Sequence, residues 1–141
     1  MRYLGLDLGT KTLGVSISDR TGLIANAYTT LRFSENDYDS ILPELKKIVA
    51  EENVEKIVLG LPRHMNYDFG DKAEIATNFG KKISEYLNIE VIMQDERMTT
   101  MEATNYMLEA NVSRKKRKEK IDSLAANIIL QTYLDRKRNE K

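Results

Sequence analysis

The chain has 141 residues, 41% of them hydrophobic, and its 22 basic residues balance its 22 acidic ones. That length suits one α/β domain spanning residues 1–141 and is too short for two large lobes. The absence of cysteine excludes a disulfide framework and a thiolate metal site. No apolar run approaches the roughly 20 residues that cross a bilayer, so we expect a cytoplasmic protein without a membrane partner.

Positive charge gathers toward the C-terminus. Residues 111–141 hold ten basic and four acidic side chains, which gives this segment a charge of +6 (ten minus four) and the remainder −6. Its densest part, Arg114–Lys120, reads as a loop before the last helix. A local basic patch suits a phosphate backbone as partner, although a solvated charged surface explains it equally well.

Three short strands open the chain. Tyr3–Leu8 is an apolar run, Leu13–Ile17 alternates apolar and small residues, and Leu23–Tyr28 follows a polar turn over residues 19–22. Short strands separated by tight polar turns predict an antiparallel meander.

Helices and strands alternate after this meander. Apolar spacing predicts a helix over Asp39–Glu52, capped by Asp39 or Ser40 with Pro43 in its first turn. The remaining predicted elements are a buried strand Lys56–Leu61, a helix Asp71–Leu87 with Ile75, Phe79 and Ile83 inward, a strand Ile89–Met93, and helices Thr99–Glu109 and Ile121–Arg136. This order implies a mixed five-stranded α/β sheet, its first three strands antiparallel, with helices on both faces.

Asp7 interrupts the first apolar run between Leu6 and Leu8. A buried, unpaired carboxylate costs several kcal/mol, so this position needs a cation, a set of hydrogen-bond donors or a metal. The alternative is an aspartate that opens the turn at Gly9.

Two further acids stand where sites are commonly built. Glu96 follows the strand Ile89–Met93, at the end where open α/β sheets place ligands, although a salt bridge with Arg97 would also account for it. Asp122 opens the predicted last helix, where it could favour the helix dipole. It nevertheless shares the small, apolar face of Ala125, Ala126 and Ile129, which directs it inward.

Carboxylates from two strand ends and one helix start suit the hard cations Mg²⁺ or Mn²⁺. Two such ions can clamp an in-line displacement at phosphorus. Zinc is disfavoured because cysteine is absent and His64 is the single histidine. The three acids therefore predict a metal-dependent phosphodiesterase.

Four motifs, taken together, resemble the YqgF family: Asp7–Val15, Gly60–Pro62, Asp95–Thr100 and Ile121–Ala126. The resemblance runs from Arg2 to Leu134. It implies an RNase H-like fold related to the RuvC-like Holliday junction resolvases, and a nuclease that matures the 5′ end of pre-16S rRNA in ribosome biogenesis. A resolvase acting on branched DNA is the alternative.

The resemblance assigns Asp7, Glu96 and Asp122 as catalytic metal ligands, with Asp95 a weaker candidate. We expect the nucleic acid, structured RNA such as a ribosomal precursor or branched DNA, to be contacted by Lys11, Arg114, Lys115, Lys116, Arg117 and Lys118. One departure from the family pattern is Tyr67, which stands where relatives have a glycine, so the contacts of the loop Met65–Gly70 stay open. The sequence is compatible with a monomer or a homodimer.

Two other functions compete with this one. Asp7–Thr10 also resembles the phosphate loop of the actin, Hsp70 and sugar-kinase group, but those proteins need two lobes and a second phosphate loop. A non-catalytic nucleic-acid-binding module would keep the fold without needing all three acids.

Overall fold

The computed structural model describes residues 1–61, 69–95 and 114–139. Its elements are β1 (Tyr3–Leu8), β2 (Thr12–Ser18), β3 (Ala25–Arg32), the 3₁₀ helix η1 (Tyr38–Ile41), α1 (Leu42–Glu52), β4 (Lys56–Leu61), α2 (Phe69–Leu87), β5 (Glu90–Asp95) and α4 (Arg114–Asn139). The predicted helix Thr99–Glu109 and the predicted loop as far as residue 68 lie outside the described residues.

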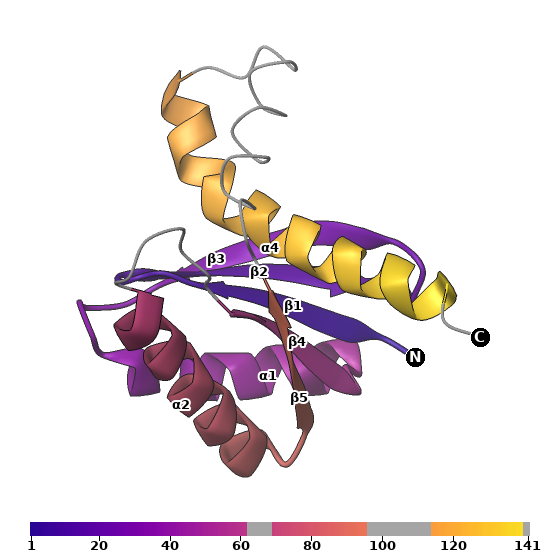
Figure 1. Cartoon of the computed structure of the whole chain (residues 1–141), viewed down its shortest axis with the longest axis horizontal. Coiled ribbons are helices and arrows are strands. Elements are labelled where there is room, and N and C mark those ends of the chain that lie inside the picture. The colour runs from indigo at the N-terminus through magenta and orange to yellow at the C-terminus, as the bar shows by residue number, and fades with distance from the viewer. Residues whose placement is uncertain (62–68, 96–113, 140–141) are drawn as a thin grey trace.

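The strands form one five-stranded sheet in the order β3-β2-β1-β4-β5. β1 and β3 both pair antiparallel with β2, whereas β1, β4 and β5 run parallel to one another. The predicted mixed α/β sheet with an antiparallel opening is therefore confirmed. The parallel strands bring their carboxyl ends to the same edge of the sheet (Figure 1).

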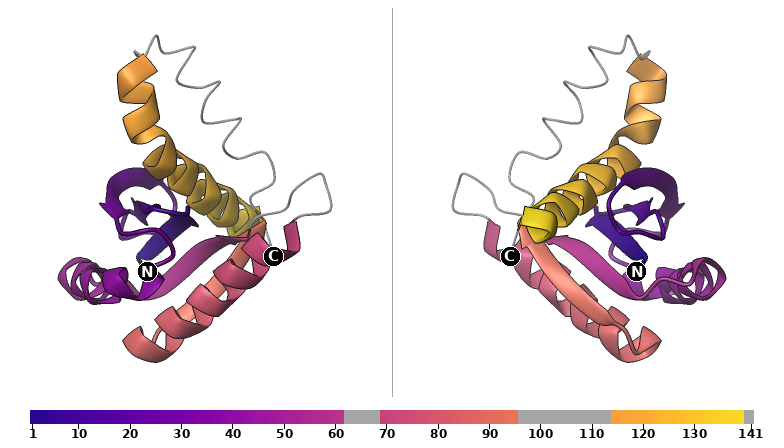
Figure 2. Two further views of the ribbon diagram at one scale, coloured as in Figure 1. Left: turned by 90° about the vertical axis from the view of Figure 1, so that its left-hand side faces the viewer. Right: turned by 90° about the vertical axis from the view of Figure 1, so that its right-hand side faces the viewer.

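Helices cover both faces of the sheet, as the element order predicted. α1 and α2 lie on one face and α4 crosses the other (Figures 1 and 2). The larger core joins Leu4 and Leu6 of β1 to Phe79 and Ile83 of α2. A smaller core beneath α4 is made by Tyr3, Ala25, Val58, Ile129, Leu130 and Leu134.

β3 begins two residues later than predicted and extends to Arg32. The Asp19 carboxylate causes the delay, because it accepts hydrogen bonds from the backbone N–H groups of Leu23 (3.0 Å) and Ile24 (3.3 Å) and from the Thr21 hydroxyl (2.7 Å). Leu23 and Ile24, the two apolar residues of this turn, are exposed. They therefore extend the turn and do not start the strand.

The first two helices differ from prediction in detail. α1 starts at Leu42, after η1, and its N-cap residue Ile41 provides no side-chain hydrogen bond, so the caps predicted from Asp39 and Ser40 are wrong. Pro43 does lie in the first turn. In α2, Ile75 is exposed and Ala76 is buried in its place, since Ala76, together with Phe79 and Ile83, faces the sheet.

α4 starts seven residues before the predicted last helix, at Arg114 against Ile121. The basic run is therefore helical, and Asp122 lies in the third turn of α4, not the first. Lysine, arginine and glutamate lose little rotamer freedom in a helix, and the run contains neither glycine nor proline. Among the described residues, no helix is both long and apolar enough to cross a bilayer.

Candidate active site

Asp7 lies next to last in β1, on the face of the sheet that α4 covers. Along β1, Tyr3 packs in the core beneath α4, whereas Leu4 and Leu6 belong to the core on the α1–α2 face. Successive side chains of a strand point to opposite faces, so Asp7 shares the face of Tyr3. It is half-buried there.

Asp7 has a glycine beside it on each neighbouring strand. It pairs with Gly14 of β2, and the register Leu6–Leu59, continued by one residue, brings Gly60 of β4 level with it. Both glycines are buried. Because glycine has no side chain, neither neighbouring strand fills the space flanking the carboxylate on this face. A carboxylate oxygen is the hard donor that a divalent cation prefers, and the two neighbouring strands add no side chain that would compete for it on this face.

α4 approaches the sheet closely next to this position. The Ser16 hydroxyl donates a hydrogen bond of 2.8 Å to the backbone carbonyl of Ala126. A Cβ atom on Gly5 would lie 2.6 Å from Cβ of Leu130 and 3.0 Å from the carbonyl oxygen of Ala126. Small residues on β1, β2 and α4 therefore hold the helix backbone against the sheet.

α4 runs antiparallel to β1 (Figure 1). Tyr133 packs against Tyr3, with ring centroids 5.8 Å apart, and Ala126 lies over Gly5. Asp122 stands one turn earlier in the helix. The four residues from Asp122 to Ala126 advance the helix by about 6 Å, close to the roughly 6.6 Å that two strand residues span. The backbone of α4 at Asp122 is thus directed toward the carboxyl end of β1.

The third predicted ligand, Glu96, lies outside the described residues, directly after β5. That strand ends at Asp95, which pairs with Leu61 of β4. Asp95 is therefore the last residue of the strand, whereas the predicted strand Ile89–Met93 left it outside. Because β1 and β5 are parallel to β4 and flank it, Glu96 follows a strand end on the same sheet edge as Asp7.

Within the described ranges, no three histidine, cysteine, aspartate or glutamate side chains gather as a metal site. The assignment of Asp7, Glu96 and Asp122 as ligands therefore stays a prediction. The structure contributes the face and register of Asp7, the helix turn that carries Asp122, and the strand end that precedes Glu96.

The hairpin between β1 and β2 brings Lys11 to the same edge. The N–H of Gly9 donates to the carbonyl of Thr12 at 2.8 Å, which leaves Thr10 and Lys11 at the exposed tip. The backbone N–H of Phe33 donates to the carbonyl of Lys11 at 2.9 Å and fixes this tip against the chain that leaves β3. Lys11 therefore stands beyond the end of the strand that carries Asp7, as a substrate contact would require.

The basic residues of the C-terminal segment divide into two groups. The predicted contacts Arg114–Lys118 occupy the first turns of α4, which extend beyond the sheet (Figure 1). At the other end, Arg136 donates to Gln94, Lys137 donates to the Tyr3 hydroxyl, and Arg138 pairs with Asp135. The hydrogen bond with Tyr3 raises the pKa of Lys137. These last cations have structural partners and explain part of the excess charge without a ligand.

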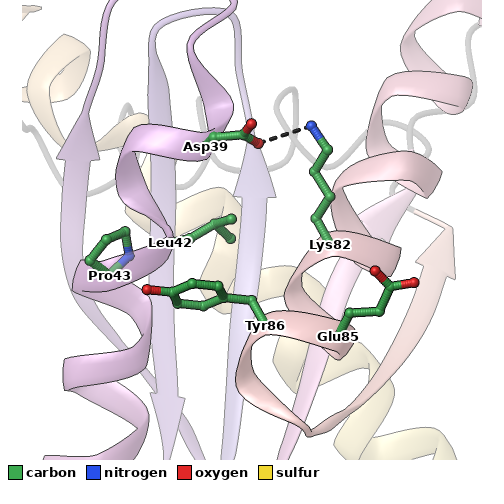
Figure 3. A pocket seen from close by; sticks show the side chains of 6 residues that line it. All are labelled: Asp39, Leu42, Pro43, Lys82, Glu85 and Tyr86. Atoms are coloured by element: carbon green, nitrogen blue, oxygen red, sulfur yellow. Dashed lines mark hydrogen bonds and ion pairs between the residues drawn. The ribbon is translucent and has the colours of Figure 1, made fainter.

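A hollow of about 490 Å³ lies between α1 and α2 (Figure 3). Its lining residues are Asp39, Leu42, Pro43, Lys82, Glu85 and Tyr86. Lys82 Nζ of α2 and the carboxylate of Asp39, in η1 just before α1, form an ion pair of 2.9 Å. Since α1 and α2 cover the face of the sheet opposite Asp7, this hollow is not part of the candidate active site.

Comparison with known proteins places this chain in a family. The family model described as "RuvX: Holliday junction resolvase" matches residues 1–136. The chain belongs to the RuvX family. The resemblance inferred from the four motifs is thereby confirmed, and membership disfavours the sugar-kinase interpretation.

Curated relatives match along nearly their whole length. A protein of Clostridium botulinum (strain Alaska E43 / Type E3), named "Putative pre-16S rRNA nuclease", is 52% identical over 136 residues, which is 96% of this chain and 98% of that one. A protein of Oceanobacillus iheyensis with the same name is 44% identical over 137 residues, 97% of this chain and all of the relative.

Solved structures of similar shape include RuvC of T. thermophilus in complex with a Holliday junction substrate. It has a TM-score of 0.63 and 14% sequence identity, and the match covers 99% of this chain and 97% of that one. The Fowlpox virus resolvase, solved with Holliday junction DNA, has a TM-score of 0.58 and 12% identity, with 96% and 98% covered. At these identities the likeness establishes the RuvC-like, RNase H-like fold.

Proposed function

We propose that this protein is a metal-dependent endonuclease that hydrolyses phosphodiester bonds and acts in the maturation of the 5′ end of pre-16S rRNA. The substrate is inferred from the name that the curated relatives carry. Such a substrate would place the activity in the cytoplasm. We further propose that residues 1–141 work as one nuclease domain.

The observation that carries the chemistry is the position of Asp7 between Gly14 and Gly60, on the sheet face beneath α4. In this proposal Asp7, Glu96 and Asp122 hold Mg²⁺ or Mn²⁺, the cations that suit an all-carboxylate donor set. A pair of such ions would lower the pKa of an attacking water and stabilise the departing oxygen.

The chain itself supplies position and charge. β1 carries Asp7. The hydrogen bond of Ser16 with the Ala126 carbonyl holds α4, which carries Asp122, against the sheet. Lys11 and residues Arg114–Lys118 hold the phosphate backbone, mainly by attraction that does not depend on base sequence. A cut in one strand needs one active site, so a monomer or a homodimer would serve, whereas a resolvase that cuts two strands would favour a dimer.

A Holliday junction resolvase is the second candidate, because the matching family model carries that description. The deciding experiment presents the purified protein with a precursor 16S rRNA 5′ segment and with a four-way DNA junction, each with Mg²⁺ and with Mn²⁺. We expect cleavage of the RNA. Junction cleavage alone would favour the resolvase, and cleavage of neither substrate would support a non-catalytic binding module.

A further inference from the structure

We propose that Arg32, at the end of β3, binds a backbone phosphate of the nucleic-acid strand that passes over Asp7. This inference rests on the proposed function and adds a substrate-binding residue to the same site. Arg32 belongs to none of the four motifs that indicated the family. Its relation to Asp7 becomes visible only from the pairing of β1, β2 and β3 in the structure.

The register of the sheet puts Arg32 on the same face as Asp7. Asp7 pairs with Gly14, and two residues earlier in β2 Thr12 pairs with Arg32. Leu31 and Phe33, on either side of Arg32, pack against the core on the α1–α2 face. Alternation along the strand therefore directs Arg32 to the opposite face, where Asp7 lies.

The spacing fits two contacts along one polynucleotide strand. Thr30 of β3 pairs with Gly14 and is thus in the row of Asp7, two strands away. Two inter-strand steps and two residues along β3 separate the Cα atoms of Asp7 and Arg32 by about 12 Å in a regular sheet. Gly14 stands between the two strands without a side chain. A backbone crossing this row can therefore present one phosphate near Asp7 and another, a few nucleotides away, to Arg32.

The guanidinium of Arg32 is available for such a contact. Arg32 is exposed, and within the described residues no carboxylate lies within ion-pair distance of it, although Glu35 and Asp37 follow closely in sequence. Arg2, by contrast, pairs with Glu52 at 3.2 Å. An unpaired guanidinium presents a planar set of donors that matches phosphate geometry.

Lys11 extends the same positive edge. The hydrogen bond from the Phe33 N–H to the Lys11 carbonyl continues the β2–β3 pairing by one step beyond Arg32. Lys11 and Arg32 therefore stand on adjoining strands at the edge of the sheet where β1 ends. Lys11 is level with Phe33, which packs on the α1–α2 face, so of these two cations only Arg32 is directed by the strand register to the face of Asp7.

The test measures binding apart from cleavage. In an Asp7→Asn background, fluorescence anisotropy follows a labelled single-stranded RNA and a labelled four-way DNA junction across a salt titration. The loss of one phosphate contact makes the slope of log K against log salt shallower by about 0.7 for a single strand and 0.9 for duplex arms. At 0.1 M salt that slope corresponds to about a fivefold to eightfold loss of affinity after Arg32→Ala. The RNA and DNA arms show which backbone uses the contact.

Arg20→Ala is the matched control. Arg20 is an exposed arginine on the turn before β3, at the opposite end of the sheet, and its removal changes the net charge equally. We expect Arg20→Ala to leave the slope unchanged and Arg32→Lys to retain it. If Arg32→Ala and Arg20→Ala give the same slope and affinity with both probes, the inference is wrong. Cleavage by the wild-type protein tests the proposed function separately. The proposed function and the role of Arg32 can therefore each fail without the other.

Discussion

Ser16 and Ala126, 110 residues apart in the chain, are joined by a hydrogen bond of 2.8 Å from the serine hydroxyl to the helix carbonyl. The Ser16 side chain is fully buried. This bond fixes α4 on β2 one turn after Asp122 and one strand away from Asp7. It is therefore the described contact that most directly sets the distance between two of the proposed metal-binding carboxylates.

Ser16→Ala should cost about 1 kcal/mol of unfolding free energy, the typical net contribution of one hydrogen bond. Its effect on cleavage should be larger, since a small displacement of α4 moves Asp122 relative to Asp7. Urea denaturation and single-turnover cleavage measure the two effects. Ser18→Ala is the control, because Ser18 bonds the Tyr3 N–H at the far end of the strand. If both variants cleave equally well, the Ser16 contact does not position the site.

Gly5→Ala should destabilise the protein by about 1–3 kcal/mol, because overpacking a tight contact displaces its neighbours. The new methyl would lie 2.3 Å from the Ser16 hydroxyl oxygen and 2.6 Å from Cβ of Leu130. Gly80→Ala provides the comparison, since its nearest neighbours are side-chain ends of Leu59 and Met93 at 3.3 Å. Alanine gains about 1 kcal/mol in helix propensity there, so we expect Gly80→Ala to be near neutral. Thermal unfolding of both variants measures the difference in stability. Equal losses of stability in the two variants would contradict the close approach of α4.

Mn²⁺ should raise the melting temperature of the protein and should fail to do so after Asp7→Asn. A ligand that binds only the folded state stabilises it by RT ln(1 + [L]/Kd), about 2.7 kcal/mol at a hundredfold excess over Kd. Differential scanning fluorimetry with increasing Mn²⁺ measures this effect without any substrate. Asp39→Asn, on the opposite face of the sheet, should respond as the unaltered protein does. A full Mn²⁺ response from Asp7→Asn would remove Asp7 from the metal site.

The turn before β3 should lose its contribution to stability in acid. The Thr21 hydroxyl and then the Leu23 N–H lower the pKa of Asp19 below its usual 3.8. Because the folded-state pKa is the lower one, the unfolded state binds the proton first, and the stabilisation present above about pH 4 is lost as the pH falls through the folded pKa. Between pH 5 and pH 3 the wild type should therefore lose more stability than Asp19→Asn, as followed by circular dichroism. Parallel pH profiles would refute this role.

The sequence predicted β1 and β4 to the residue, because each is a compact apolar run with clear ends. It misplaced the start of β3. Leu23 and Ile24 have the side chains of strand residues, but their N–H groups donate hydrogen bonds to the Asp19 carboxylate and so belong to the turn. It read Arg114–Lys120 as a loop because charge, not apolar spacing, dominates that run.

The candidate site, too, could be predicted only in part. The sequence could single out Asp7 as a candidate, because a carboxylate inside an apolar run has few structural explanations. The pairing of Asp7 with Gly14, and the place of Arg32 on the same face, could not. Both depend on strand register, and the place of Arg32 depends as well on the irregularity between Val15 and Ser16 in the β2–β3 pairing, which no local pattern in the sequence specifies.

The central claim is that Asp7 belongs to a metal-dependent phosphodiesterase site, and cleavage of a precursor 16S rRNA 5′ segment by wild type and by Asp7→Asn tests it most directly. The wild type should cleave the RNA with Mg²⁺ or Mn²⁺ and lose this activity when the cations are chelated. Asp7→Asn, shown to be folded by circular dichroism, should cleave at least a hundredfold more slowly, a loss of about 2.7 kcal/mol of transition-state stabilisation. Full activity in Asp7→Asn, or undiminished cleavage after chelation, would contradict the account.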